Sequence, residues 1–201
     1  MSEYIEVFTK NTDRVLQGDI YRDIDFIESF KEYEEKDGTY LKIELIHYPY
    51  IIVLTQDCDL EQDYKNKIEN GTKEKDADKF QDKYLFSVIV APLYIADDVI
   101  QGVHLSKLGY KMQNIRNVST SKVGLVMLNE IPRYHYLNIL HNPPIPASII
   151  DFKHYFTVTL EELTVNKKAN YIRTIKPLFR EKVSQRFSSY LSRIGLPDPP
   201  P

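Results

Sequence analysis

Tyr50-Ile51-Ile52-Val53-Leu54-Thr55-Gln56-Asp57-Cys58-Asp59-Leu60-Glu61-Gln62-Asp63 is the stretch around which the chain is organised. Its first half is an unbroken run of apolar and β-branched residues, and its second half places acidic residues around the only cysteine. A short apolar run of this kind predicts a strand that is buried on both faces. The acidic residues would then stand where the strand leaves the sheet, which is a common position for binding or catalytic groups.

The composition of the chain provides enough apolar residues for one packed domain. Its 201 residues are 42% hydrophobic and 12% aromatic, with a formal net charge of −3. This charge does not support a general nucleic-acid-binding protein, which usually carries a basic excess. The single cysteine excludes an internal disulfide and a cysteine-based zinc site. Since no signal peptide and no apolar run approaching the ~20 residues of a membrane span is found, we expect a cytoplasmic protein that does not enter membranes.

The pattern along the chain predicts a loose N-terminal arm over 1–16, one domain over 17–195 and a proline-rich tail over 196–201. Residues 64–83 are almost wholly charged or amide-bearing, and we expect a mobile insertion there because such residues cannot bury enough surface to offset chain entropy. Strands are expected after Gly18 and over seven further ranges: 40–46, 50–55, 84–93, 123–128, 134–140, 148–152 and 155–160. Asp37-Gly38 is typical of a hairpin turn.

Two segments have helical spacing of apolar residues. One is 95–112, which predicts one or two short helices. The other is 176–194, where a proline at the start, an apolar stripe and a glycine at the end predict an amphipathic C-terminal helix. The expected fold is therefore α+β, with a strongly curved antiparallel sheet, short helices and this C-terminal helix packed on it.

The order of the expected elements resembles that of the PemK-like toxin family. The resemblance is carried by Gly18-Asp19-Ile20, by the strands 51–55 and 86–92, and by the return through Asp151-Phe152-Lys153 to the last helix. It covers roughly half the chain and implies an SH3-like barrel that cleaves RNA without a metal. The catalytic residues of the family are not matched: no arginine stands in the loop before the second strand, and Leu93-Tyr94 follow the third strand where the family has a hydroxyl residue.

Asp57, Asp59 and Glu61 alternate along what we expect to be an extended exit from the central strand. Side chains at such spacing face one way, about 7 Å apart. Carboxylates of this arrangement suit Mg²⁺ or Mn²⁺, which bind through one or two acids together with water and substrate phosphate. The alternative is a solvated loop in which the acids cap turns or pair with lysine and arginine. Cys58 would point to the other side, and we expect a small buried core residue rather than a catalytic thiol.

A second cluster is Arg133-Tyr134-His135-Tyr136. Strand alternation would place Arg133 and His135 on one face, where they could hold a phosphate and transfer a proton as catalytic residues. Tyr134 and Tyr136 would lie on the other face and could stack bases, so they are candidate substrate-binding residues together with Gln56. The alternative is an ordinary amphipathic strand. His154 is a weaker candidate, and His104 has no partner that is visible in the sequence.

These patterns favour a protein that processes nucleic acid or binds nucleotides, in a toxin or phage-defence setting. If it is an enzyme, we expect a nuclease or phosphodiesterase that acts on RNA or DNA. The alternative is a non-enzymatic adaptor or regulatory subunit that binds another protein through the acidic insertion and the C-terminal helix.

Overall fold

The computed structural model describes residues 4–35, 37–71, 81–139 and 144–193. The strands are β1 (Tyr4–Ile5), β2 (Val7–Phe8), β3 (Asp19–Glu35), β4 (Gly38–Val53), β5 (Val88–Pro92), β6 (Tyr94–Ile95), β7 (Tyr134–Ile139), β8 (Ser148–Asp151), β9 (Phe156–Val158) and β10 (Tyr171–Ile175). The helices are α1 (Asp57–Gly71), η1 (Gln81–Lys83), α2 (Ala96–Gln101), η2 (Ser106–Leu108), α3 (Ile115–Val118), α4 (Thr120–Met127), η3 (Glu162–Asn166), η4 (Lys168–Asn170) and α5 (Pro177–Leu191).

The predicted central strand is the inner half of β4. It lies inside a six-stranded sheet of order β2-β10-β3-β4-β5-β9. Ile52 points into one core cluster, whereas Ile51 and Val53 point into another on the opposite face of the sheet. Because successive side chains of a strand alternate between faces, the inner half of β4 is buried on both faces, as the apolar run predicts.

A four-stranded sheet of order β1-β7-β8-β6 completes the body of the molecule. Its residues share the first core cluster with the six-stranded sheet and with α5, which contributes Phe179, Val183 and Phe187. Helices α2, α3 and α4 pack on this second sheet through a third cluster. Two sheets that share a core with a helix confirm the α+β class, but neither sheet is closed into a barrel.

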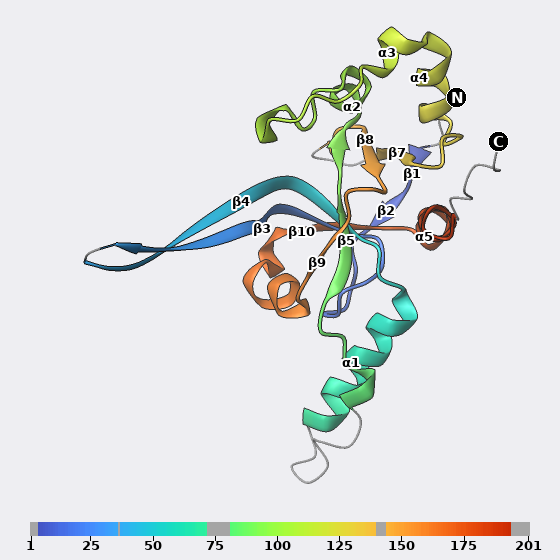
Figure 1. The fold of residues 1–201 in the computed structure, drawn as a ribbon. Coiled ribbons are helices and arrows are strands. Elements are labelled where there is room, and N and C mark those ends of the chain that lie inside the picture. Colours follow the sequence, from blue (N-terminus) through green and yellow to red (C-terminus); the bar gives the residue numbers. More distant parts are fainter. Residues whose placement is uncertain (1–3, 36, 72–80, 140–143, 194–201) are drawn as a thin grey trace, which may run out of the picture.

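The outer halves of β3 and β4 form a long two-stranded arm. Figure 1 shows this hairpin extending away from the body, far beyond the strands that flank its root. The strands pair from Ile20 with Ile52 at the root to Glu35 with Gly38 at the tip. The hairpin turn predicted at Asp37-Gly38 is confirmed, and Gly38 adopts a positive φ of 152° that favours glycine. Pro49 does not interrupt the strand, because β4 continues through it.

Two expectations about irregular segments do not hold for the described residues. Residues 4–16 are not a loose arm, since β1 pairs with β7 and β2 pairs with β10, while Val15 and Leu16 are buried. In the segment 64–83, residues 64–71 continue α1 and residues 81–83 form η1. Residues 72–80 and the tail over 196–201 lie outside the described residues. Long-range pairing of two-residue strands leaves no periodic signal in the sequence. The helix α1 is held to the body by Leu60 in the second core cluster and by the buried Asp63, which accepts from the Leu85 amide.

The segment expected to be a strand over 123–128 is helical instead. Residues 123–127 belong to α4, and α3 precedes it directly in the chain. A short apolar run does not distinguish a buried strand from a buried helix. Here Val126 anchors the helix by packing into the third cluster. The expected strands over 134–140 and 148–152 correspond to β7 and β8, and α5 confirms the C-terminal helix.

Candidate functional site

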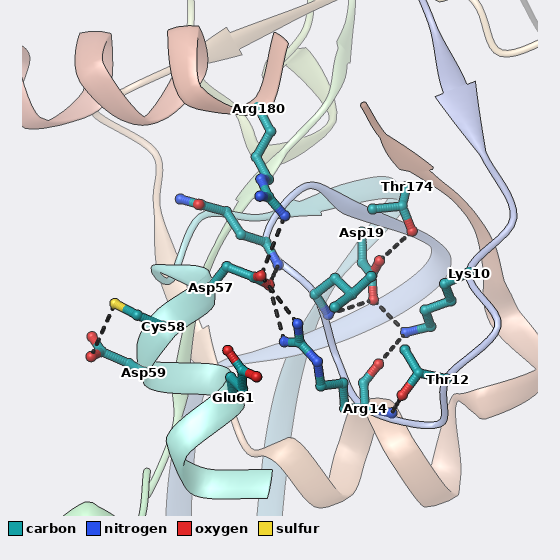
Figure 2. A network of polar contacts seen from close by, with 12 residues as sticks. Lys10, Thr12, Arg14, Asp19, Asp57, Cys58, Asp59, Glu61, Thr174 and Arg180 are labelled. Atoms are coloured by element: carbon teal, nitrogen blue, oxygen red, sulfur yellow. Dashed lines mark hydrogen bonds and ion pairs between the residues drawn. The ribbon is translucent and has the colours of Figure 1, made fainter. Parts of the chain in front are cut away.

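Asp57 stands at the first turn of α1, between two arginines that come from distant parts of the chain. Arg14 donates from Nη1 and Nη2 to the two carboxylate oxygens, each over 3.1 Å, and the backbone amide of Gln17 donates to Oδ1 over 3.2 Å. Nη1 of Arg180, on α5, lies 3.5 Å from Oδ2. Figure 2 shows Asp57 held between these two side chains. The carboxylate therefore ties the N-terminal segment and α5 to the end of the central strand.

The charges around Asp57 favour its ionised form. Burial alone would raise its pKa, but the hydrogen bonds and charge of Arg14, the Gln17 amide and Arg180 outweigh burial, so the pKa of Asp57 lies below its ordinary value. A bidentate arginine–carboxylate pair also fixes the geometry of both partners. Asp57 is consequently a charged anchor at neutral pH.

A groove of about 410 Å³ opens beside this anchor, between the start of α1 and one side of α5. It is lined by polar side chains, namely Gln17, Gln56, Asp57, Cys58, Arg180, Glu181, Ser184, Gln185 and Ser188. Nε of Arg180 is buried and has no hydrogen-bond partner among the described residues. Gln56, which was predicted to bind substrate, lines this groove. Its role in substrate binding stays a prediction.

The prediction that Asp57, Asp59 and Glu61 lie on extended backbone is wrong, because these residues lie on α1. At about 100° per residue, a helix turns Asp59 to the side opposite Asp57. Figure 2 shows Asp59 pointing away from Arg14, while Glu61 points toward it. Glu61 is itself paired with Lys65 over 2.6 Å. Within the described residues these three acids do not gather as a set of metal ligands, so the geometric basis for a Mg²⁺ or Mn²⁺ site is lost.

Cys58 is exposed rather than buried. The helix, instead of the expected strand, directs its thiol to the surface, where Sγ lies 3.6 Å from Oε1 of Gln56 and 3.6 Å from Oδ1 of Asp59. The sequence had placed it in the core on the basis of strand alternation. A helix begins at Asp57 instead of a strand, because Gln56 and the acids after it begin a run without β-branched residues.

A second carboxylate, Asp19, is fully buried behind the first. Its oxygens accept hydrogen bonds from Thr174 Oγ1 over 2.6 Å and from the Leu16 amide over 2.9 Å, and Oδ2 is ion-paired with Lys10. Burial raises the pKa of Asp19 even though Lys10, Thr174 and the Leu16 amide all favour the charged form. Figure 2 shows both carboxylates reached from the same N-terminal loop.

Arg133 and His135 do not form the predicted catalytic pair. Arg133 donates to the buried Asp151 at the end of β8, from Nε to Oδ1 over 2.8 Å. His135 faces the core, and burial together with the charges of Arg186 and Lys182 lowers its pKa to about 3. An imidazole with this pKa is neutral at pH 7 and is poorly suited to act as a general acid. The sequence could not show that β7 turns His135 inward against α5.

Tyr134 and Tyr136 belong to the third core cluster and are not a platform for bases. Tyr136 is buried, and its backbone is fixed by Asn129, which accepts from the Tyr136 amide over 2.6 Å and donates to its carbonyl over 3.2 Å. Neither tyrosine lines the groove beside Asp57. The structure therefore does not bring the acidic stretch and the Arg133-Tyr136 cluster together.

One face of the β3–β4 arm carries a stripe of exposed apolar side chains, which we call the arm face. Ile27 lies opposite Leu45, Phe30 opposite Ile43, and Glu32 opposite Leu41. Residues directly opposite on antiparallel strands share a face, and the bulge between Ile27 and Ser29 keeps Phe30 on the side of Ile27. The exposed fractions are 55% for Ile27, 72% for Phe30, 58% for Leu41, 48% for Ile43 and 58% for Leu45.

The middle of the other face of the arm is polar, whereas Tyr33 opposite Tyr40 near the tip and Phe26 opposite Ile46 near the root place aromatic and apolar side chains at its two ends. It carries the pairs Lys31 with Lys42 and Ser29 with Glu44, and Lys42 is ion-paired with Glu44 over 2.8 Å. Acidic residues dominate the arm as a whole: Asp23, Asp25, Glu28, Glu32, Glu34, Glu35, Asp37 and Glu44. The sequence predicts a strand over 40–46 here, but the bulge that aligns the apolar residues cannot be seen from spacing alone.

Comparison with known proteins gives no neighbour: no family model, no curated protein and no solved structure matches this chain. The resemblance to PemK-like toxins accordingly stays a prediction. No helix within the described residues has the length and apolar character needed to cross a membrane.

Proposed function

We propose that this chain is an interaction subunit that binds another protein through the arm face. The observation that supports this proposal is the apolar stripe on a projecting hairpin. The five side chains of the arm face are 48–72% exposed and lie beside one another, so they form one apolar patch. A patch of this kind on a monomer commonly marks an interaction site. A lone two-stranded hairpin is also only marginally stable in water, so a partner that covers it would stabilise it.

The charge of the arm defines the chemistry of its partner. Acidic side chains surround the apolar stripe, and Glu32 lies within it. Two copies of this arm would bring like charges together, whereas a partner with a basic rim and an apolar centre would complement the face. We therefore expect a partner of this kind, bound with an affinity that falls as salt is raised.

Phe30→Ser combined with Ile43→Thr is expected to weaken partner binding on the order of 100-fold, because buried apolar anchors dominate interface energies. The measurement is the affinity of tagged full-length chain for the protein that copurifies with it in stoichiometric amount from its host. The matched control is Val165→Ser with Leu178→Ser, which removes apolar side chains of similar exposure, 68% and 62%, outside the arm.

The proposal is overturned if no protein copurifies at physiological salt, or if the arm variant keeps the partner. Sedimentation of the purified chain provides a further test, for which we expect a monomer. A dimer that the arm variant dissociates would assign the face to a second copy of this chain instead.

A second candidate function is binding of nucleotides or nucleic acid in the groove beside Asp57. It is favoured by the two arginines at the start of a 15-residue helix, a position where backbone amides also attract phosphate. Here Asp57 already accepts hydrogen bonds from Arg14 and forms an ion pair with Arg180. A phosphate would therefore compete with the carboxylate for Arg14 and Arg180.

Asp57→Asn is accordingly expected to strengthen phosphate binding about tenfold, because it removes the competing charge, whereas Arg180→Gln is expected to weaken it. The measurement is binding and cleavage of labelled RNA, DNA and ATP, with Mn²⁺ or with EDTA. Arg193→Gln is the matched control, since this arginine stacks on Tyr190 away from the groove. Loss of binding in Asp57→Asn, together with a requirement for Mn²⁺, would instead support the metal role that the sequence assigned to Asp57.

A further inference from the structure

Three residues from two segments of the chain gather at the end of strand β8. His104 lies in the loop between α2 and η2, Asp151 ends β8, and His154 stands in the turn that follows β8. Each offers a ligand atom, and these three atoms all lie within 4.8 Å of one another. No other group of this kind is found in the part of the chain that the structure describes.

The imidazoles of this cluster lack the hydrogen bonds that buried rings normally make. Both ring nitrogens of His104 are buried and make no hydrogen bond of normal geometry, although the backbone of Asp98 interacts with the ring, and Nδ1 of His154 is buried without a partner among the described residues. A neutral imidazole carries one donor and one acceptor, and leaving these groups unmade in the interior costs free energy. Unsatisfied groups of this kind in a native protein require an explanation, and a bound ion or water is one.

The carboxylate of the cluster is already positioned. Asp151 is fully buried, and its Oδ1 accepts from Nε of Arg133 over 2.8 Å and from the Lys153 amide over 3.1 Å. Its Oδ2 also accepts from Arg133, over 2.5 Å from Nη2, and lies 3.6 Å from Nδ1 of His154. Hydrogen bonds of this kind orient carboxylates that bind metals. Arg133 thus fixes the acid while His154 remains beside its second oxygen.

The aromatic ring of Tyr94 forms a wall of the same site. Its centroid lies 4.9 Å from that of His104 and 5.8 Å from that of His154, in edge-to-face geometry. Burial is the main cause that lowers the pKa of both histidines, so both rings are in the neutral form that binds metal ions. Gly102, two residues before His104, adopts a left-handed φ of +75°. A Cβ at this position would lie only 2.6 Å from the Met112 carbonyl oxygen, so the turn that leads to His104 has no room for a side chain.

We propose that His104, Asp151 and His154 bind a divalent transition metal ion of the zinc type. Two imidazoles and one carboxylate are nitrogen and oxygen ligands that suit Zn²⁺, whereas Mg²⁺ prefers oxygen ligands alone. Metal–ligand distances of about 2.0–2.2 Å require the three atoms to close around the ion by small side-chain rotations. Three protein ligands leave a fourth position for water or a bound molecule.

The test is Zn²⁺ binding to the purified full-length chain, measured by competition with a chromophoric chelator, and Co²⁺ binding followed by visible absorption. We expect one ion per chain and a rise in melting temperature with Zn²⁺. His104→Gln and His154→Gln should each weaken binding at least 100-fold. His47→Gln is the matched control, because this exposed imidazole pairs with Asp25 outside the cluster and its loss should leave affinity unchanged.

The proposal is overturned if the wild-type chain binds no stoichiometric Zn²⁺, or if both glutamine variants bind it as tightly as the wild type. His154→Gln protects the test against misfolding, because a quarter of this side chain is exposed and its replacement should be tolerated. The absorption of the Co²⁺ form of the wild-type chain is independent of any variant, and a spectrum typical of hexaaqua Co²⁺ would exclude the site. Neither result depends on whether the arm face binds a partner.

Discussion

Asp19→Ala is expected to lower the free energy of unfolding by about 3–5 kcal/mol, because it leaves a buried cation without its partner. Lys10 is the cation, and its side chain is 9% exposed beside a carboxylate that is fully buried. The same change leaves the Leu16 amide and Thr174 Oγ1 without the oxygens that they contact. Asp19 joins the N-terminal segment, β3 and β10, so its loss should also loosen the loop that carries Arg14. Urea unfolding followed by circular dichroism is the measurement.

The control for this prediction is Asp13→Ala, which removes an exposed carboxylate that is paired with Lys168 over 2.8 Å. Exposed pairs contribute about 0–1 kcal/mol, so this variant should unfold almost as the wild type does. Since burial raises the pKa of Asp19 despite its partners, the pair does not fully offset its desolvation. We therefore expect Lys10→Met with Asp19→Leu to recover much of the stability lost in Asp19→Ala. A loss below about 1 kcal/mol in the single variant would contradict a central role for this carboxylate.

The parts of the fold that could be predicted are those in which a local pattern decides the structure. The apolar run over 50–55 gives the inner half of β4, Asp37-Gly38 gives the hairpin, and the stripe after Pro177 gives α5. The elements that were missed depend on distant partners. β1 and β2 are two-residue strands that exist only because β7 and β10 lie beside them. The helix α4 was missed because its short apolar run is compatible with either kind of element.

The candidate sites show the same division. Asp57 follows the central strand, where the acidic stretch was expected, but its partners Arg14 and Arg180 are separated from it by 43 and 123 positions. His104 could not be linked to His154, because they are brought together by packing of the loop after α2 against the end of β8. The arm face depends on a single bulge that realigns Phe30 with Ile27. None of these three-dimensional relations leaves a regular spacing in the sequence.

The protein is expected to lose stability steeply as the pH falls below about 6.5, and His135 is the largest single cause. In the unfolded chain this imidazole binds a proton near pH 6.5, whereas in the folded protein burial and the charges of Arg186 and Lys182 lower its pKa to about 3. Above pH 6.5 the ring is neutral in both states and has no effect. Between pH 6.5 and 3 the unfolded chain binds the extra proton, so the free energy of unfolding decreases, by about 3 kcal/mol between pH 7 and 4.

His135→Leu should remove this part of the pH dependence, since leucine fills a similar volume and Nδ1 of His135 has no hydrogen-bond partner to lose among the described residues. The slope should become shallower without vanishing, because burial also lowers the pKa of His104 and His154, and Arg14 lowers that of Asp57. The measurement is urea unfolding at pH 7, 5.5 and 4 for wild type, His135→Leu and the exposed control His47→Leu. Parallel curves for all three proteins would show that His135 can be protonated in the fold, and that the contact between β7 and α5 is open to water.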